Sequence, residues 1–379
     1  NHGAVLMWLA IRQAFAERGH SVRWVVQADA NPRSRDWHDG WVLLPSILER
    51  LRGWPVALWY FFMPKVLRSA LGVLSPRDVD VVLDASGFAY GDDWGALRAY
   101  RRLGNHRHRY RDNVPVVLLP QAFGPFHRPV LAAVLRAALP RAAAIYARDA
   151  ESERALNALK LGESPRIHRG DDFTLTVTPL NPTEVDAQHC RNSFVLVPNE
   201  MIVRTGRLDR ERYIDWLVGV ARSIIQSGNQ IVWINHGGDG DQRIIEAARD
   251  KIGATAGALI SHRDPRYLKG CLQLARGGLV SRFHAGVSAY SLGVPVVLAG
   301  WSHKYAALAE SFHVASLNSE TWDGNSPEDV ARTILKAASK PEYRANCLQA
   351  AEVLRNQSHA MWDVCLLYTS PSPRDLSTS

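Results

Sequence analysis

Cysteine is scarce in this chain of 379 residues, which contains only four. They lie far apart in the sequence, and no two of them have the spacing of metal ligands. This distribution argues against a disulfide framework and a zinc site, and it predicts reduced thiols at Cys190, Cys271, Cys347 and Cys365. We expect neither a bound metal nor a cofactor.

Long hydrophobic runs are also absent. The longest apolar stretch is the interrupted WPVALWYFFM at residues 54–63, which is far too short to cross a bilayer. The chain does not open on the charged and apolar pattern of a signal peptide. These absences predict a soluble, cytoplasmic protein.

The charge is unbalanced toward basic residues. The chain has 45 Lys and Arg against 37 Asp and Glu, a formal net charge of +8. The arginines are spread along the chain, and no DNA- or RNA-binding signature occurs, so we expect no nucleic-acid partner. Anionic small substrates or an anionic membrane surface explain the charge equally well.

Both ends of the chain are unusual for an α/β protein. The sequence enters a helical pattern directly after Asn1, where a first strand is expected, which suggests that an opening strand is missing. At the other end, CLLYTSPSPRD at residues 365–375 resembles the translation of an adapter used in DNA sequencing libraries. We therefore interpret residues 364–379 as a non-native tail.

Strand and helix patterns alternate along the rest of the chain. A polar, proline-bearing stretch at residues 179–192 divides two such series and is typical of a linker. The strands are continuously apolar, as in parallel sheets that are buried on both faces. We expect an α/β fold with two doubly wound, Rossmann-like domains facing each other across a cleft, at residues 1–178 and 193–363. The expected strands are residues 21–26, 80–85, 115–120, 143–148, 165–169, 193–198, 230–235, 258–261, 278–281 and 295–300.

One stretch, SRFHAGVSAYSLGVPVVLAGWSHKY at residues 281–305, carries the strongest functional signal. Arg282 and His284 fall between a predicted strand and a helix, and Lys304 follows the next strand. Ligands bind beyond the carboxyl ends of such strands, where helix N-termini attract anions. Arginine adds a two-pronged donor for phosphate or carboxylate, and histidine can carry a proton.

A further cation, Arg148, follows a strand of the first domain and precedes a helix that Asp149 is expected to cap. If the domains face each other, these cations converge on a ligand with more than one negative group. Plainer interpretations remain for each residue alone. Arg148 could pair with a carboxylate of its own helix, His284 could be an ordinary helix N-terminal histidine, and Lys304 could be an exposed lysine.

Weaker candidates occupy other strand ends. Asn199 and His236 follow predicted strands of the second domain and could line the same cleft. Asp92 and Asp93 lie in SGFAYGDDWG, a glycine-bearing loop without GxGxxG spacing, and could take sugar hydroxyls or a proton. Gln121 is a plausible hydroxyl contact.

Six elements in this order resemble the polysaccharide pyruvyltransferase family. They are NHGAVL at the start, LLPQAFGPF at residues 118–126, YARDAESERAL at 146–156, DDFTL at 171–175, SRFHAGVSAYSLGVPVV at 281–297 and SHKY at 302–305. Each is weak alone, whereas the ordered set is highly specific. The resemblance extends to about residue 315. The first-domain loop DASGFAYGDDWG departs from the family, in which this loop is richer in glycine.

The resemblance implies a fold similar to the GT-B glycosyltransferases and transfer of pyruvyl from phosphoenolpyruvate to two sugar hydroxyls. The family's essential residues fall on Arg148, His284 and Lys304, with Arg282 beside the histidine. His284 is then the acid/base group. The implied acceptor is a polysaccharide or lipid-linked glycan of exopolysaccharide or cell-envelope biosynthesis, which the protein could meet at the inner face of the membrane.

Alternatives remain open. Residues 48–68 could form a helix hairpin of the core, or they could contact an anionic membrane where a lipid-linked acceptor waits. The protein could instead be a GT-B glycosyltransferase using a nucleotide sugar, or a catalytically silent glycan-binding relative.

Overall fold

The computed structural model describes residues 2–27, 42–43, 64–70, 73–74, 78–104, 114–162, 166–300, 304–317 and 325–367. Most of the apolar segment 48–68 lies outside these ranges, and so do residues 368–379 of the predicted tail. Within the described part of the chain, no helix combines the length and apolar character needed to span a membrane.

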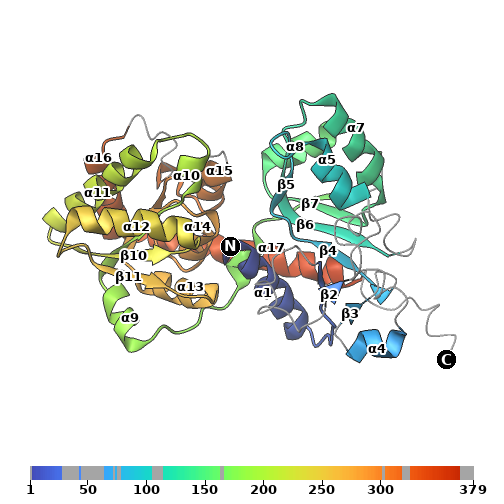
Figure 1. The fold of residues 1–379 in the computed structure, drawn as a ribbon, viewed down its shortest axis with the longest axis horizontal. Coiled ribbons are helices and arrows are strands. Elements are labelled where there is room, and N and C mark those ends of the chain that lie inside the picture. The colour runs from blue at the N-terminus through green and yellow to red at the C-terminus, as the bar shows by residue number, and fades with distance from the viewer. Residues whose placement is uncertain are drawn as a thin grey trace. The chain divides into compact units, whose positions relative to one another are not determined.

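The chain forms two compact units (Figure 1). Unit 1 comprises Asn1–Gln13 and Asp172–His359, and unit 2 comprises Ala14–Asp171 and Ala360–Ser379. These boundaries differ from the expected ones because the first thirteen residues join the second half of the chain. Two of the three boundaries fall within helices α1 (His2–Glu17) and α17 (Pro341–Leu367), and the third falls between Asp171 and Asp172. The expected linker contains helix α9 (Glu184–Cys190).

Unit 1 is built on a five-stranded parallel sheet with the order β11-β10-β9-β12-β13. The inner strand β9 places Val195 opposite Val232 of β10 and Gly278 of β12. The expected continuous apolar strands are confirmed, and β9, β12 and β13 are buried throughout. The strands are β9 (Ser193–Val197), β10 (Gln230–Asn235), β11 (Ala258–Ser261), β12 (Gly277–Val280) and β13 (Val296–Leu298).

Helices cover this sheet, and Figure 1 shows α11 and α16 on one side of β10 and β11 and α9 and α13 on the other. Helix α11 starts at its cap Asp209, which accepts a hydrogen bond from Arg212 N, and it buries the apolar stripe that includes Tyr213 and Ile224. The remaining elements are α10 (Met201–Arg204), α11 (Arg210–Gln226), α12 (Asp239–Ile252), α13 (Pro265–Leu274), α14 (Phe283–Ser291), α15 (Lys304–Ser311), α16 (Pro327–Ser339) and the 3₁₀ turns η5 (Phe173–Thr176) and η6 (Ala315–Leu317).

Unit 2 contains a second parallel sheet, ordered β4-β6-β7-β8, with β5 pairing to β6. Strand β6 is buried along its whole length, which confirms the apolar pattern expected at residues 115–120. The strands are β4 (Val82–Asp84), β5 (Phe88–Tyr90), β6 (Val116–Phe123), β7 (Ala144–Ala147) and β8 (Arg166–Arg169). An α/β fold with two parallel sheets is therefore confirmed.

Unit 2 also contains shorter elements among its described residues. A small parallel sheet contains β1 (Val26–Gln27), β2 (Val42–Leu43) and β3 (Val73–Leu74), so the strand expected at residues 21–26 was misplaced toward the N-terminus. The helices include α8, whose expected cap Asp149 is confirmed because its Oδ1 accepts a hydrogen bond from Ser152 N over 2.7 Å. They are α4 (Lys65–Ala70), α5 (Gly95–Ala99), the π-helix η3 (Tyr100–Gly104), α7 (Pro129–Ala138), the 3₁₀ turn η4 (Leu139–Arg141) and α8 (Ala150–Ala158).

Candidate active site

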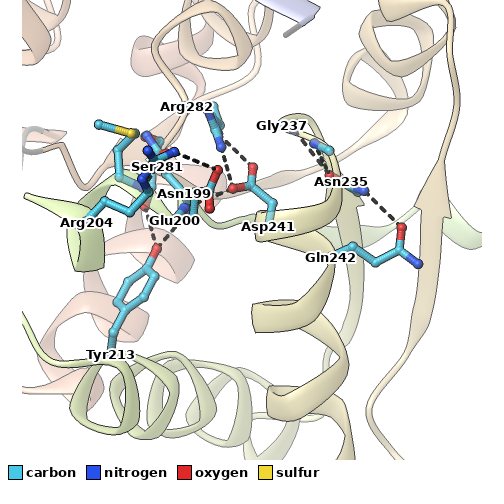
Figure 2. Close-up of polar contacts among 12 residues, drawn as sticks. Asn199, Glu200, Arg204, Tyr213, Asn235, Gly237, Asp241, Gln242, Ser281 and Arg282 are labelled. Carbon is cyan, nitrogen blue, oxygen red and sulfur yellow. Dashed lines mark hydrogen bonds and ion pairs between the residues drawn. The ribbon is translucent and has the colours of Figure 1, made fainter.

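Arg282 lies at the carboxyl edge of the unit 1 sheet, between β12 and the first turn of α14. Its guanidinium forms a two-pronged ion pair with Asp241 (Figure 2), and Nε lies 2.7 Å from Oδ2. The Asp241 side chain is fully buried and that of Arg282 is 18% exposed. The pair therefore fixes the plane and direction of the arginine, and it uses two of the three guanidinium nitrogens.

Two glycines of the segment NHGGDGD leave room for charged side chains at this edge, and Gly237 leaves room for the ion pair itself. A Cβ at Gly237 would overlap with both the Arg282 guanidinium and the Asp241 carboxylate. A Cβ at Gly240 would overlap with the Glu200 carboxylate. Asp241 also accepts a hydrogen bond from Glu200 N over 2.9 Å. The loops that follow β9, β10 and β12 are thus joined through one buried carboxylate.

Asn199, which the sequence suggested as a cleft residue, braces the same edge (Figure 2). Its Nδ2 donates to Ser281 O over 2.9 Å, and its Oδ1 accepts from Met201 N over 3.0 Å. The hydroxyl of Tyr213 accepts a hydrogen bond from Asn199 N, and burial raises the pKa of that tyrosine. Both polar atoms of the Asn199 amide bond to backbone groups, so Asn199 stabilises the turn that carries Arg282.

His236 and His2 lie together in unit 1, with ring centroids 5.3 Å apart and nearly perpendicular planes. Burial lowers the pKa of His2 to about 4, and it lowers the pKa of His236 well below its ordinary value. Both imidazoles are therefore neutral near pH 7. In the part of the chain that the structure describes, His2 Nδ1 and His236 Nε2 are buried without a hydrogen-bond partner. Such atoms are polar groups to which a ligand can bond.

His284 occupies the first turn of α14, two residues after Arg282. Its Nε2 lies 3.6 Å from Oδ2 of Asp172, a carboxylate that is 7% exposed. A carboxylate at this distance stabilises the protonated imidazole. On the other side of the ring, a Cβ at Gly3 would overlap with Nδ1, so only glycine lets α1 approach the imidazole this closely. The sequence elements NHG, DDFTL and SRFH therefore meet at His284.

Lys304 begins α15 and lies near the same edge. Its Nζ is 5.4 Å from the ring centroid of Phe283 and 5.6 Å from that of Tyr305. The Tyr305 hydroxyl donates to Ser281 O over 2.8 Å, which ties the start of α15 to the end of β12. Arg282, His284 and Lys304 are consequently held by adjoining elements of unit 1.

The remaining candidates belong to unit 2. Arg148 is 8% exposed and follows β7, and its backbone N donates to Gln121 O over 3.1 Å. Gln121 is fully buried, with Nε2 3.5 Å from Asp84 O. Asp92 accepts hydrogen bonds from His127 N and Arg128 N, which braces the loop before α7, and Asp93 is exposed.

Sequence reasoning missed a polar network in unit 2. Asp84, the last residue of β4, accepts hydrogen bonds from Ser86 and from the Tyr90 hydroxyl, and Arg102 donates to the Ser86 hydroxyl. Burial raises the pKa of Tyr90, and the adjacent Asp84 acts in the same direction. The signal was present in DASGFAYGD, where an aspartate ends a strand before a glycine-bearing loop.

Comparison with solved structures defines the fold class first. A protein described as a UDP-N-acetylglucosamine 2-epimerase from Listeria monocytogenes is 11% identical, with 95% of this chain and 92% of that chain covered and a TM-score of 0.56. The S. aureus MnaA–UDP co-structure is 14% identical, with 98% and 97% covered and a TM-score of 0.55. At these identities the likeness shows the fold alone, a GT-B-like α/β architecture.

The family follows from the sequence. A model of the family described as polysaccharide pyruvyl transferase matches residues 1–303, so the chain belongs to this enzyme family. No curated protein matches the chain. The matched residues include the three elements that meet at His284 and the segments that carry Arg148 and Arg282. The resemblance seen in the sequence is thereby confirmed over residues 1–303, and Lys304 lies just beyond the match.

Proposed function

We propose that the protein transfers the pyruvyl group of phosphoenolpyruvate to two hydroxyls of a glycan sugar, with release of phosphate and formation of a cyclic ketal. Membership of the polysaccharide pyruvyl transferase family supports this reaction class. The observation that carries the proposal is the environment of His284, which lies between Asp172 and Gly3 and two residues after the fixed guanidinium of Arg282. A histidine that can carry a proton, His284, and an arginine that can bind an anion, Arg282, therefore lie at the same edge of the sheet.

Donor binding is assigned to the cations at this edge. Phosphoenolpyruvate carries a phosphate and a carboxylate, so it suits several fixed positive groups. Arg282 is held by Asp241, Lys304 begins α15, and the N-terminus of α14 adds its own partial charge. The proposal also gives Arg148 of unit 2 a part in donor binding, as the family resemblance implies.

The chemistry is assigned to His284. The protonated imidazole donates its proton to the methylene carbon of phosphoenolpyruvate, which gives an oxocarbenium-like centre at the neighbouring carbon. A sugar hydroxyl adds to this centre, phosphate leaves, and the second hydroxyl closes the ketal. One hydroxyl proton restores the imidazolium and the other leaves with the phosphate. Asp172 stabilises the charged imidazole before transfer, and the cations stabilise the departing phosphate.

The acceptor is proposed to be a polysaccharide or lipid-linked glycan of exopolysaccharide or cell-envelope biosynthesis, met in the cytoplasm at the inner face of the membrane. Gln121 and Asp93 of unit 2 are the proposed hydroxyl contacts. Asp92 fits this role less well because both of its oxygens already accept backbone hydrogen bonds.

The proposal is tested by measuring phosphate release from phosphoenolpyruvate with a panel of glycan acceptors. We expect acceptor-dependent release by the wild type, and we expect His284→Ala to abolish it while phosphoenolpyruvate still binds. His189→Ala is the matched control, since His189 is an exposed histidine at the end of α9 in the same unit. Unchanged release by His284→Ala would remove His284 from the mechanism, and release of a nucleoside diphosphate from a sugar nucleotide would favour glycosyl transfer.

A further inference from the structure

Lys269 is a buried lysine that the reaction above does not use. It lies on α13 and is 1% exposed. Its Nζ donates hydrogen bonds to two backbone carbonyls, Thr174 O at 3.2 Å and Leu175 O at 3.1 Å. A buried ammonium group is costly unless specific contacts compensate for lost hydration. These two hydrogen bonds therefore explain why a lysine is buried here, and both of them hold the same turn of backbone.

That turn is η5, and the residue that caps its start, Asp172, is the one that faces His284. Asp172 caps η5, because its Oδ1 accepts hydrogen bonds from Thr174 N at 3.0 Å and from Thr174 Oγ1 at 2.5 Å. Its other oxygen, Oδ2, lies 3.6 Å from His284 Nε2. The position of the carboxylate relative to the imidazole thus depends on where the η5 backbone is held.

We propose that Lys269 is a positioning residue that clamps the η5 turn and so holds the Asp172 carboxylate opposite the His284 imidazole. This inference rests on the proposed role of His284 in pyruvyl transfer. An alkyl side chain at position 269 would remove the lysine donor from both carbonyls. Thr174 O would keep its hydrogen bond from Val177 N at 3.2 Å, whereas the Leu175 carbonyl would lose the Lys269 bond, and the turn would move to compensate. The lysine then acts on His284 through the η5 backbone and the Asp172 carboxylate, and it touches no reacting atom.

The clamp does not depend on the charge of the lysine. Burial lowers the pKa of Lys269 to about 7, Arg355 acts in the same direction, and Asp172 opposes them. The neutral amine still has two N–H groups, which is the number that the two carbonyls require. Both hydrogen bonds can therefore persist on either side of neutral pH.

The test is a ¹⁵N NMR titration of the His284 imidazole in the full chain, with its signals assigned by their loss in His284→Gln. We expect Lys269→Met to lower the midpoint of this titration, in the direction that Asp172→Asn also produces, because each variant weakens carboxylate support of the imidazolium. Leu272→Ala is the matched control, since it removes a buried apolar side chain from the same helix without removing the clamp. We expect it to leave the midpoint unchanged.

A second variant covers the case in which Lys269→Met does not fold. Thr174→Val removes the Oγ1 hydrogen bond to Asp172 but keeps the carbonyl that Lys269 contacts, so we expect a smaller shift in the same direction. If Lys269→Met folds, an unchanged midpoint of the His284 titration would overturn the inference. If only Thr174→Val folds, an unchanged midpoint in that variant would overturn it.

Kinetics separate this inference from the proposed function. In Lys269→Met we expect kcat for acceptor-dependent phosphate release to fall about tenfold, which is about 1.4 kcal/mol, with KM for phosphoenolpyruvate changed less than about twofold. A shifted midpoint with no pyruvyl transfer by the wild type would refute the proposed function and support the clamp.

Discussion

Arg282 shows at the scale of one residue how a predicted anion ligand can also be a structural partner. The sequence places it at a strand end beside His284, and the structure adds that its guanidinium is fixed by the buried carboxylate of Asp241. This partner was hard to assign from sequence, since an aspartate in a polar loop has many possible roles. Lys269 and Asp172 were missed because the contacts that give them their roles, the Lys269 hydrogen bond to Thr174 O and the ion pair of Asp172 with His284, join distant parts of the chain.

Replacing Asp241 with asparagine should destabilise the protein. The change removes the buried carboxylate that pairs with the Arg282 cation, so we expect the free energy of unfolding to fall by about 3 kcal/mol. Urea denaturation measures the change. Asp215→Asn is the control, because it breaks an exposed pair with Lys251 and should change little. Equal losses of unfolding free energy in both variants would show that the burial of the Arg282–Asp241 pair does not contribute to stability.

Lys269 should give the protein a characteristic pH dependence of stability. Burial lowers its pKa to about 7 in the folded state from the ordinary lysine value of 10.5. Above pH 7 the unfolded chain therefore binds more protons at this site than the folded chain, and stability rises with pH. Relative to Lys269→Met, we expect the wild type to gain up to about 1.4 kcal/mol per pH unit between pH 7 and 9 and nothing below pH 6. Urea denaturation across this pH range measures the free energy of unfolding of both proteins. A difference between the two free energies that does not change with pH would contradict the account.

At the scale of secondary-structure elements, periodicity predicted the central strands and several helices well. The apolar runs of β6, β9 and β10 and the buried face of α11 follow directly from residue spacing. Short elements were predicted less well. Strand β1 is two residues long and is defined by its pairing with β2, a contact that the local sequence does not encode. Helix α9 was hidden in a polar, proline-bearing stretch, although Thr183 caps it in the usual way.

The first turn of α1 gives a prediction at this scale. In Gly3→Ala the new Cβ would overlap with the His284 imidazole, so either the helix or the ring must move. We expect kcat to fall at least about tenfold while the far-ultraviolet circular dichroism spectrum stays like that of the wild type. Ala4→Ser, at an exposed position of the same turn, is the control. Full activity in Gly3→Ala would show that the close approach of α1 does not position the imidazole.

At the scale of the whole molecule, the family match gives the enzyme class and the parallel sheets give the fold, whereas the division of the chain needed the structure. The sequence suggested one boundary near residues 179–192. Instead, residues 1–13 join unit 1, where Gly3 meets His284 and Gln13 Nε2 donates to Thr176 O over 3.1 Å. Contacts between residues so far apart in sequence leave no periodic trace, which is why this boundary could not be predicted.

Arg148 belongs at this scale because it is the proposed contribution of unit 2 to donor binding. We expect Arg148→Ala to raise KM for phosphoenolpyruvate strongly and to lower kcat less, since a binding cation is lost while the acid/base group remains. Steady-state phosphate release over a range of phosphoenolpyruvate concentrations measures both constants. An unaltered KM would refute the role of Arg148. Arg154→Ala, an exposed arginine on α8, is the control.

The central claim is that this chain protonates the methylene carbon of phosphoenolpyruvate and delivers the resulting group to a glycan. Mass spectrometry of the product formed in deuterium oxide tests both steps together. The account predicts a ketal whose methyl group carries one solvent deuterium, formed with the wild type and absent with His284→Ala. A glycan product without solvent deuterium, or equal labelling by His284→Ala, would contradict it.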